Sequence, residues 1–320
     1  MLSLVNKYAF RSVTGITLIS IMLVMLFSVS NGAVHAAPRH YTWYAQVGVA
    51  SSDQALQGKV FLPGVLWIDK GDTVVWTVKT GEIHTVTFLR PGQKEPTFSD
   101  SDPQQTNKQG GSHYDGKSYF NSGVLSSYPA FHMATKYSLT FDVTGNFTYY
   151  CLVHTPMTGL IHVRPAGTRY PFSQRSYNQQ VSKAAHVILQ NASKLTQEAT
   201  DLSNSHFIID GIGKGSAMVM RFFPQRAVIH VGDSITFVNT DAIEPHTVTF
   251  GVAQPNDFVP YGNPTAFDGT APLNSGFIGA DPGWFGMIYT VKFVKAGTFA
   301  FRCDLHDYMG MLEKIVVLSR

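Results

Sequence analysis

A chain of 320 residues with 44% hydrophobic and 14% charged residues is long enough for two globular domains and too apolar to be disordered. Its formal net charge of only +3 excludes the strongly basic surface on which nucleic-acid binding depends. Aromatic residues make up 12% of the chain, a content that fits a protein with β structure.

The first 36 residues have the order of a secretory signal. Lys7 and Arg11 precede an apolar stretch at residues 13–29, and a small-residue cleavage sequence ends at Ala36. We expect residues 1–36 to be a signal peptide that is either cleaved after Ala36 or kept as an uncleaved membrane anchor, because the apolar stretch is rather long. Both alternatives predict an exported protein in the periplasm, at the cell surface or outside the cell.

The remainder of the chain contains a repeat. Landmarks that share residue types and spacing occur in the same order twice, at residues 61–63, 71–76, 84–88, 121–123 and 141–151 and again at residues 222–224, 232–237, 246–250, 274–276 and 293–303. Such a series predicts a duplicated domain. We place the two copies at residues 37–166 and 206–320.

Both copies have the pattern of β-strands. Residues 74–78 and 235–238 are rich in β-branched and aromatic side chains, and aromatic residues alternate along the chain up to Cys151 and Cys303. The Gly-Asp pairs at residues 71–72 and 232–233 indicate turns between such strands. The pattern favours a sandwich or barrel in each copy.

A long helix is predicted between the copies, within a linker at residues 167–205. Residues 173–202 contain neither proline nor glycine, and Val181, Ile188, Leu195 and Leu202 recur every seven residues. This spacing predicts an amphipathic helix with one narrow apolar seam. The seam suits either a spacer that packs on a domain or folds back, or a dimerising coiled coil.

Cys151 and Cys303 each open the same short motif. A disulfide between them would be the ordinary interpretation in an exported protein, but each cysteine has its own copy of the same surroundings. A histidine follows each cysteine by three residues, at His154 and His306, and a methionine follows shortly after. A thiolate, an imidazole and a thioether on one loop, together with a distant histidine, form the ligand set of a trigonal copper site with a weak axial methionine.

These motifs resemble, twice over, those of the cupredoxins, the plastocyanin/azurin family of blue copper proteins. The resemblance covers residues 59–163 and 218–317 and implies an all-β fold of two antiparallel Greek-key β-sandwich domains joined by a long α-helical linker. It further implies two copper ions, one per domain. The ligands that it implies are His84, Cys151, His154 and Met157 in the first domain and His246, Cys303, His306 and Met311 in the second.

The axial methionine of the second copy has two candidates. In the first copy an apolar residue, Ile161, follows Met157 by four positions. The residue four positions after Met311 is also an isoleucine, whereas Met309 is followed at that distance by the charged Glu313. We therefore expect Met311 to be the ligand and Met309 to pack beside the site.

The resemblance implies an extracytoplasmic one-electron carrier, not an enzyme, that serves redox partner proteins of unknown identity. The residues before the two cysteines are Tyr150 and Arg302, and no His-x-His pair occurs, so the sequence offers no ligands for the second copper centre of a multicopper oxidase or nitrite reductase. A protein that stores or delivers copper without redox cycling is the other alternative. We expect electrons to pass through His154 and His306, at apolar surface patches formed by their neighbours.

Overall fold

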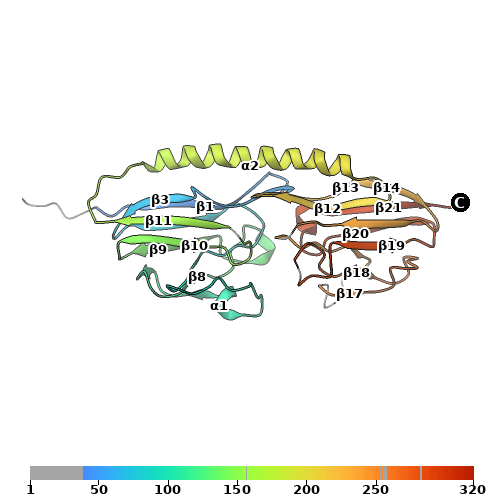
Figure 1. Cartoon of the computed structure of the whole chain (residues 1–320), viewed down its shortest axis with the longest axis horizontal. Coiled ribbons are helices and arrows are strands. Elements are labelled where there is room, and N and C mark those ends of the chain that lie inside the picture. The colour runs from blue at the N-terminus through green and yellow to red at the C-terminus, as the bar shows by residue number, and fades with distance from the viewer. Residues whose placement is uncertain (1–38, 156, 242, 253, 255–257, 282) are drawn as a thin grey trace, which may run out of the picture. The chain divides into compact units, whose positions relative to one another are not determined.

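The computed structural model describes residues 39–155, 157–241, 243–252, 254, 258–281 and 283–320. The expected signal or anchor at residues 1–36 lies outside these residues. The described chain is mostly β structure, as expected, arranged as an N-terminal half and a C-terminal half that lie beside each other under one long helix (Figure 1). Among the described residues, no helix is both long and apolar enough to span a membrane.

One nine-stranded sheet runs through both halves. Its strands, in spatial order, are β19 (Ile288–Lys292), β15 (Ser234–Val238), β12 (Phe207–Lys214), β13 (Ala217–Phe223), β2 (Leu56–Leu62), β1 (Thr42–Ala50), β4 (Thr73–Val78), β9 (Lys136–Phe141) and β7 (His113–Tyr114). The halves join where β13 pairs with β2 in an antiparallel register that sets Gln57 opposite Met218. The expected strands at residues 74–78 and 235–238 are β4 and β15.

Each half has its own second sheet of six strands. The N-terminal sheet has the order β3 (Val65–Asp69), β11 (Thr158–Arg164), β10 (Gly145–Tyr150), β5 (Thr87–Phe88), β8 (Phe120–Ser122) and β6 (Lys108–Gln109). The C-terminal sheet has the order β14 (Arg226–His230), β21 (Leu312–Leu318), β20 (Gly297–Arg302), β16 (Thr249–Phe250), β18 (Leu273–Ser275) and β17 (Pro260–Tyr261). The matching order reflects the sequence repeat.

The strand pairing is mixed, whereas an antiparallel sandwich was expected. In the N-terminal half β1 runs parallel to β4, and β3 runs parallel to β11. In the C-terminal half β12 runs parallel to β15, and β14 runs parallel to β21. Each copy thus has a parallel pair in the same place in each of its two layers, and the N-terminal half has a further parallel pair between β7 and β9.

Two core clusters fill the space between the layers, one in each half. Aromatic side chains dominate both, because rings that alternate along β10 and β20 point inward. In the N-terminal half the Trp76 ring meets the Tyr149 ring edge-on at 5.4 Å between centroids. In the C-terminal half Phe237 and Phe301 meet in the same way at 5.3 Å. Both cysteines belong to these cores.

The long helix α2 (Gln174–Leu202) confirms the helix expected from the seven-residue spacing. Ser173 caps its N-terminus by accepting a hydrogen bond from the N–H of Ser176 at 3.2 Å. Its apolar seam packs on strands of both halves, where Ala192, Leu195 and Ala199 join one cluster with residues of β12 and β13. The helix therefore lies across the nine-stranded sheet and contacts both halves. Of the expected seam, only Leu202 is clearly exposed.

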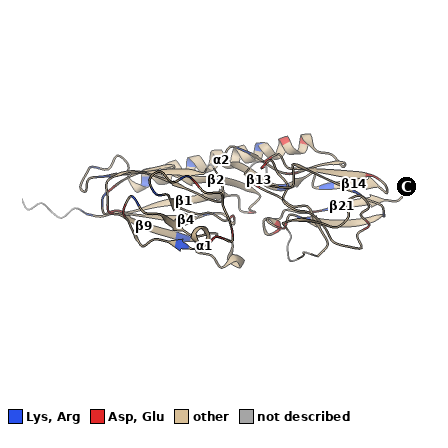
Figure 2. Cartoon of the chain, turned by 60° about the horizontal axis from the view of Figure 1, so that its bottom comes forward, with Lys and Arg blue, Asp and Glu red and all other residues tan. Residues whose placement is uncertain are grey.

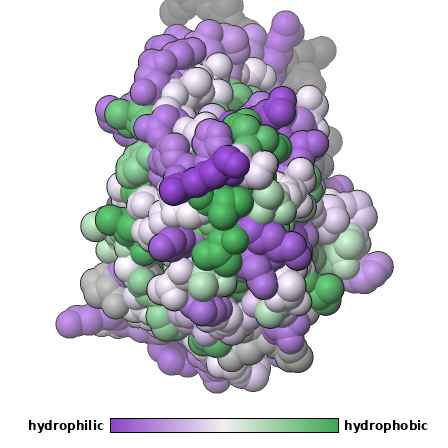
Figure 3. Space-filling model, turned by 90° about the vertical axis from the view of Figure 1, so that its right-hand side faces the viewer, coloured by the Kyte–Doolittle hydropathy of each residue, from purple (hydrophilic) through white to green (hydrophobic). Residues whose placement is uncertain are grey.

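One short α-helix and two 3₁₀ turns complete the described elements. They are α1 (Pro103–Thr106), η1 (Pro129–Phe131) and η2 (Asp307–Met309). Lys and Arg positions and Asp and Glu positions are scattered along the ribbon, and both kinds occur on α2 (Figure 2). At the end face of the C-terminal half, apolar and polar side chains alternate (Figure 3).

Candidate metal centres

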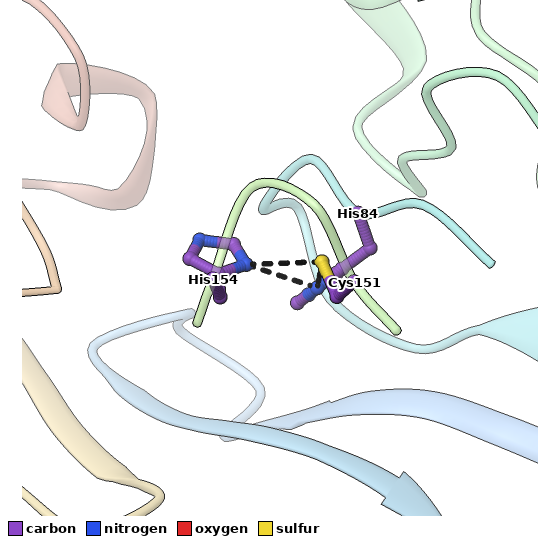
Figure 4. Close-up of side chains that lie close together, drawn as sticks. All are labelled: His84, Cys151 and His154. Atoms are coloured by element: carbon purple, nitrogen blue, oxygen red, sulfur yellow. Dashed lines mark hydrogen bonds between the residues drawn. The ribbon is translucent and has the colours of Figure 1, made fainter. Parts of the chain in front are cut away.

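Three expected ligands of the N-terminal half converge on one point (Figure 4). His84 lies between β4 and β5 and pairs through its backbone with Leu125, Cys151 directly follows β10, and His154 lies on the loop before β11. The Cys151 Sγ atom is 3.6 Å from the His84 Nδ1 atom and 3.7 Å from the His154 Nδ1 atom. The two Nδ1 atoms are 3.2 Å apart.

The C-terminal half brings together the matching residues. The Cys303 Sγ atom lies 3.7 Å from the His246 Nδ1 atom and 3.4 Å from the His306 Nδ1 atom. The two Nδ1 atoms are 3.0 Å apart. As in the first half, the distant histidine pairs through its backbone with the segment beside it, here at Ile278.

Each triangle of donor atoms has room for one metal ion. In both halves the point equidistant from the three atoms lies about 2.0 Å from each, close to the lengths of metal–imidazole and metal–thiolate bonds. One cysteine and two histidines in a trigonal arrangement are the donors of a blue copper site. The residues therefore fit one copper ion in each half.

Hydrogen bonds from threonine hold each cysteine loop in place. The N–H of Thr85 donates to the Cys151 Sγ atom at 3.4 Å, and the Thr85 hydroxyl accepts from the N–H of Leu152 at 2.8 Å. Thr247 makes both contacts in the C-terminal half at the same distances. The His-Thr pair of each copy thus supplies one expected ligand and the residue that fixes the opposing loop.

The cysteine environment favours a bound cation. Burial raises the pKa of the Cys151 thiol, although the N–H of Thr85 donates to its sulfur. A thiolate in such surroundings depends on a positive charge beside it, and a coordinated metal ion supplies that charge while displacing the thiol proton.

Met157 and Met311 occupy equivalent places. The N–H of Cys151 donates to the carbonyl of Met157 at 3.0 Å, and the N–H of Cys303 donates to the carbonyl of Met311 at 3.0 Å. Both methionines are buried in the same core cluster as their cysteine. This correspondence favours Met311 as the fourth ligand of the second centre.

Met309 lies in a different environment. It packs with Met218 and Met220 in a separate small cluster, and its Sδ atom accepts a hydrogen bond from the Gln57 side-chain amide at 3.7 Å. Its sulfur is thus engaged with a residue of the N-terminal half. This placement fits the expectation that Met309 is a packing residue.

A glycine in the left-handed conformation lies against the first histidine of each centre. Gly48 (φ +68°) and Gly211 (φ +73°) occur at register shifts in β1 and β12. A Cβ atom on Gly211 would lie 2.2 Å from the His246 Nε2 atom, and one on Gly48 would lie 3.0 Å from the His84 Nε2 atom. Backbone conformation and space both require glycine at these positions.

Two buried glutamates lie between the centres. Glu82 and Glu244 each precede the first histidine of their copy by two residues, and each is only 4% exposed. Their carboxylates face the Nε2 atoms of His154 and His306. Neither glutamate was expected from the sequence, although the same Glu-x-His spacing in both copies carried a signal.

Burial and opposite charge set the ionisation of this cluster. Burial lowers the pKa of His84 to about 3. Burial also opposes the charge on His306, but the neighbouring Glu82 carboxylate outweighs it and raises the pKa of His306 to about 10, while His306 lowers the pKa of Glu82 to about 2. Burial lowers the pKa of Lys59, which pairs with Glu244, to about 8. Glu82 is therefore ionised at neutral pH, and Lys59 is largely protonated.

The expectation that His154 and His306 reach apolar surface patches is wrong. Both are only 2% exposed, because each ring faces the opposite half. Tyr308, a close neighbour of His306 in the sequence, stacks on Tyr128 with ring centroids 4.3 Å apart and donates its hydroxyl to the carbonyl of Gly81 at 3.2 Å. The loop of the second centre therefore packs on the N-terminal half.

Part of the chain is similar to known proteins. Residues 210–318 match the family described as copper binding proteins, plastocyanin/azurin family. The chain is 33% identical over 97 residues to chloroplastic plastocyanin of Tetradesmus obliquus, a match that covers 30% of this chain and 57% of the relative. It is 30% identical over 99 residues to chloroplastic plastocyanin of Chlamydomonas reinhardtii, covering 31% of this chain and 59% of the relative. The chain thus spans less than two thirds of these relatives.

Solved structures are also similar to parts of the chain. A mutant of amicyanin with Cu(I) is 24% identical, with a TM-score of 0.23, and the match covers 35% of this chain and 79% of amicyanin. Native pseudoazurin from Hyphomicrobium denitrificans is 22% identical, with a TM-score of 0.24, and the match covers 35% and 73% of the two chains. Residues 210–318 are thus similar to the plastocyanin/azurin family of copper-binding proteins.

Proposed function

We propose that this protein is a blue copper protein that carries one electron at each of two type 1 copper sites, one in each half. The observation that carries the proposal is the pair of matched Cys-His-His triangles, each of a size that fits one ion. Copper held by such donors cycles between Cu(I) and Cu(II). The chain's own residues supply the thiolate, the two imidazoles and the methionine.

The burial of the donors favours an electron carrier over an enzyme. The six triangle residues are at most 2% exposed, so little of either centre is open to a substrate. The threonine hydrogen bonds and the core packing hold the donors in one arrangement, which limits rearrangement when the charge of the ion changes. A copper store benefits less from two closed, thiolate-containing sites of this kind.

We further propose that the protein works outside the cytoplasmic membrane and exchanges electrons with redox partner proteins. The charged, apolar and small-residue order of residues 1–36 supports export. Fractionation of the expressing cells, together with the N-terminal sequence of the mature chain, tests both export and cleavage after Ala36. A mature protein that remains in the cytoplasm with residues 1–36 intact would contradict this part of the proposal.

Copper quantitation combined with visible and EPR spectra of the wild type, Cys151→Ser and Cys303→Ser tests the proposed function. The wild type should bind two copper ions and, when oxidised, show an intense thiolate-to-copper charge-transfer band. Each variant should lose one ion and about half of the band, because each cysteine serves one centre. The two variants act as matched controls for each other.

Other results would identify the alternatives. A wild type that binds copper but stays colourless after treatment with an oxidant would be a store or a delivery protein. A wild type that binds copper beyond two ions and consumes oxygen or nitrite would be an enzyme. Loss of both ions in either single variant would contradict one complete site per half.

A further inference from the structure

The two loop histidines meet the same pair of carboxylates. The His306 Nε2 atom lies 3.2 Å from a Glu82 oxygen and 3.1 Å from a Glu244 oxygen. The His154 Nε2 atom lies 3.4 Å from the other Glu244 oxygen and 3.9 Å from the other Glu82 oxygen. In Figure 4 this ring nitrogen of His154 is on the side away from Cys151. Each carboxylate thus contacts a ligand of both centres.

The arrangement follows the sequence repeat. Glu82 is two residues from His84, a ligand of the first centre, and its closest histidine is His306 of the second. Glu244 is two residues from His246, and it contacts His154 of the first centre. The glutamates therefore cross between the halves, and neither belongs to one centre alone.

The carboxylates of this cluster depend on few partners. Within the described part of the chain, they are buried beside one ammonium group, that of Lys59, which pairs with Glu244, and beside the rings of both loop histidines. A buried charge without compensation is costly. Glu82 therefore depends on the loop histidines as its close partners.

A metal ion among Glu82, His154 and Glu244 is a competing interpretation, since these residues also form a group of potential donors. Two features favour a bridge of direct carboxylate–imidazole contacts instead. Lys59 already supplies a cation to Glu244. Moreover, a histidine that binds a metal through Nδ1 keeps its proton on Nε2, where it donates to a carboxylate.

We propose that Glu82 and Glu244 are shared positioning residues that orient both loop histidines and couple the two copper centres electrostatically. The inference rests on the proposed function. The same two carboxylates stabilise positive charge at both centres, and a positive charge gained at one centre repels a positive charge gained at the other. Oxidation of the first centre therefore makes oxidation of the second less favourable. The two centres behave as one coupled pair, in which every substitution in the bridge affects both.

The reduction potentials of both centres in Glu82→Gln and Glu244→Gln test the proposal. Each substitution removes one negative charge close to both histidines, so each should raise both potentials. The expected change is on the order of tenfold in the oxidation equilibrium, about 59 mV for a one-electron couple, the size expected for unit charges about 10 Å apart at an effective dielectric constant of about 20. Glu82→Asp keeps the negative charge, so both of its reduction potentials should stay close to those of the wild type.

Two further samples complete the experiment. Glu198→Gln removes a carboxylate from the exposed side of α2 and should leave both potentials unchanged. Cys151→Ser leaves copper in the second centre only, and that centre should then oxidise more readily than the second step of the wild type by a similar factor. This comparison measures the coupling without a change in the bridge.

The outcomes separate this proposal from the proposed function. If the wild type shows no charge-transfer band, the proposed function fails. If both centres load with copper but each glutamine variant shifts only one potential, the shared bridge is refuted while the two-site carrier stands. If the wild type binds a third metal ion per chain and Glu82→Gln does not, the two glutamates form a metal site, and the proposed bridge is wrong.

Discussion

The glycine beside the first histidine of each centre allows a test of how the sheet positions the expected metal ligands. Substitution Gly211→Ala places a Cβ atom 2.2 Å from the His246 Nε2 atom, whereas ordinary contact begins at 3.4 Å. The ring must therefore move by about 1 Å, several times the tolerance of about 0.2 Å for a metal–ligand distance. We expect copper affinity of the second centre to fall at least about 10–100-fold, the range seen when a ligand loses its orienting partner.

Backbone strain alone would not explain this loss, and the chain contains a matched control. Gly215 has a φ of +62°, similar to the +73° of Gly211, but nothing lies within 4 Å of the position that a Cβ atom would take there. Alanine at either position costs about 1–2 kcal/mol of folding stability because φ is positive. Only Gly211→Ala should weaken copper binding.

The assay is a titration with Cu(II) followed by the thiolate-to-copper band, combined with urea denaturation of the metal-free protein. Gly211→Ala should reach about half of the wild-type band, whereas Gly215→Ala should reach all of it at similar metal-free stability. Gly48→Ala should weaken the first centre, since its Cβ atom would meet Thr80 at 2.3 Å and His84 at 3.0 Å. Full copper loading of Gly211→Ala would refute the steric argument.

Three further predictions concern stability. Leu195→Ala should lower the free energy of unfolding by about 2–5 kcal/mol in urea denaturation, because Leu195 is buried in the cluster under α2; a change below about 1 kcal/mol would show that α2 contributes little packing. Asn121→Ala should cost about 1–3 kcal/mol, because the Asn121 side chain accepts from the N–H of Gly123 at 3.0 Å and donates to the buried backbone of Gln105 at 2.8 Å; unchanged stability would contradict this role. Burial raises the pKa of Tyr114 to about 12. The unfolded chain ionises at the ordinary tyrosine pKa of about 10, so this group contributes its full stability below about pH 10 and loses it as the pH rises through about 12. Alkaline denaturation of Tyr114→Phe should therefore show a smaller loss over this range than the wild type, and equal losses would contradict the assignment.

The repeat made much of the molecule predictable. Cys151 and Cys303 could be assigned separate surroundings because each stood in its own copy of one pattern, and the structure places each beside two histidines instead of beside the other cysteine. The helix was predictable from the spacing of Val181, Ile188 and Leu195. Apolar residues that recur every seven positions indicate an amphipathic helix, whichever surface the helix packs against.

The contacts between the halves could not be predicted in the same way. A hydrophobic pattern tells which side of a strand is buried, but it does not tell which surface of one copy meets the other. Glu82 and Glu244 therefore looked like ordinary loop residues, and His154 and His306 were expected at the surface. The parallel pairing of β1 with β4 was also missed, because alternation along a strand carries no information on the direction of its neighbour.

The pairing of β2 with β13 has a consequence for the origin and the integrity of the chain. Gln57 faces Met218, which is its own counterpart in the repeat, and the neighbouring pairs mirror each other around this point. That is the self-complementary register of a two-fold symmetric homodimer. A single copy produced alone would present an open strand edge, which templates association with another copy. Because both copies lie in one polypeptide, the contact between β2 and β13 forms within the chain. Unlike the contact between separate subunits, it does not depend on protein concentration.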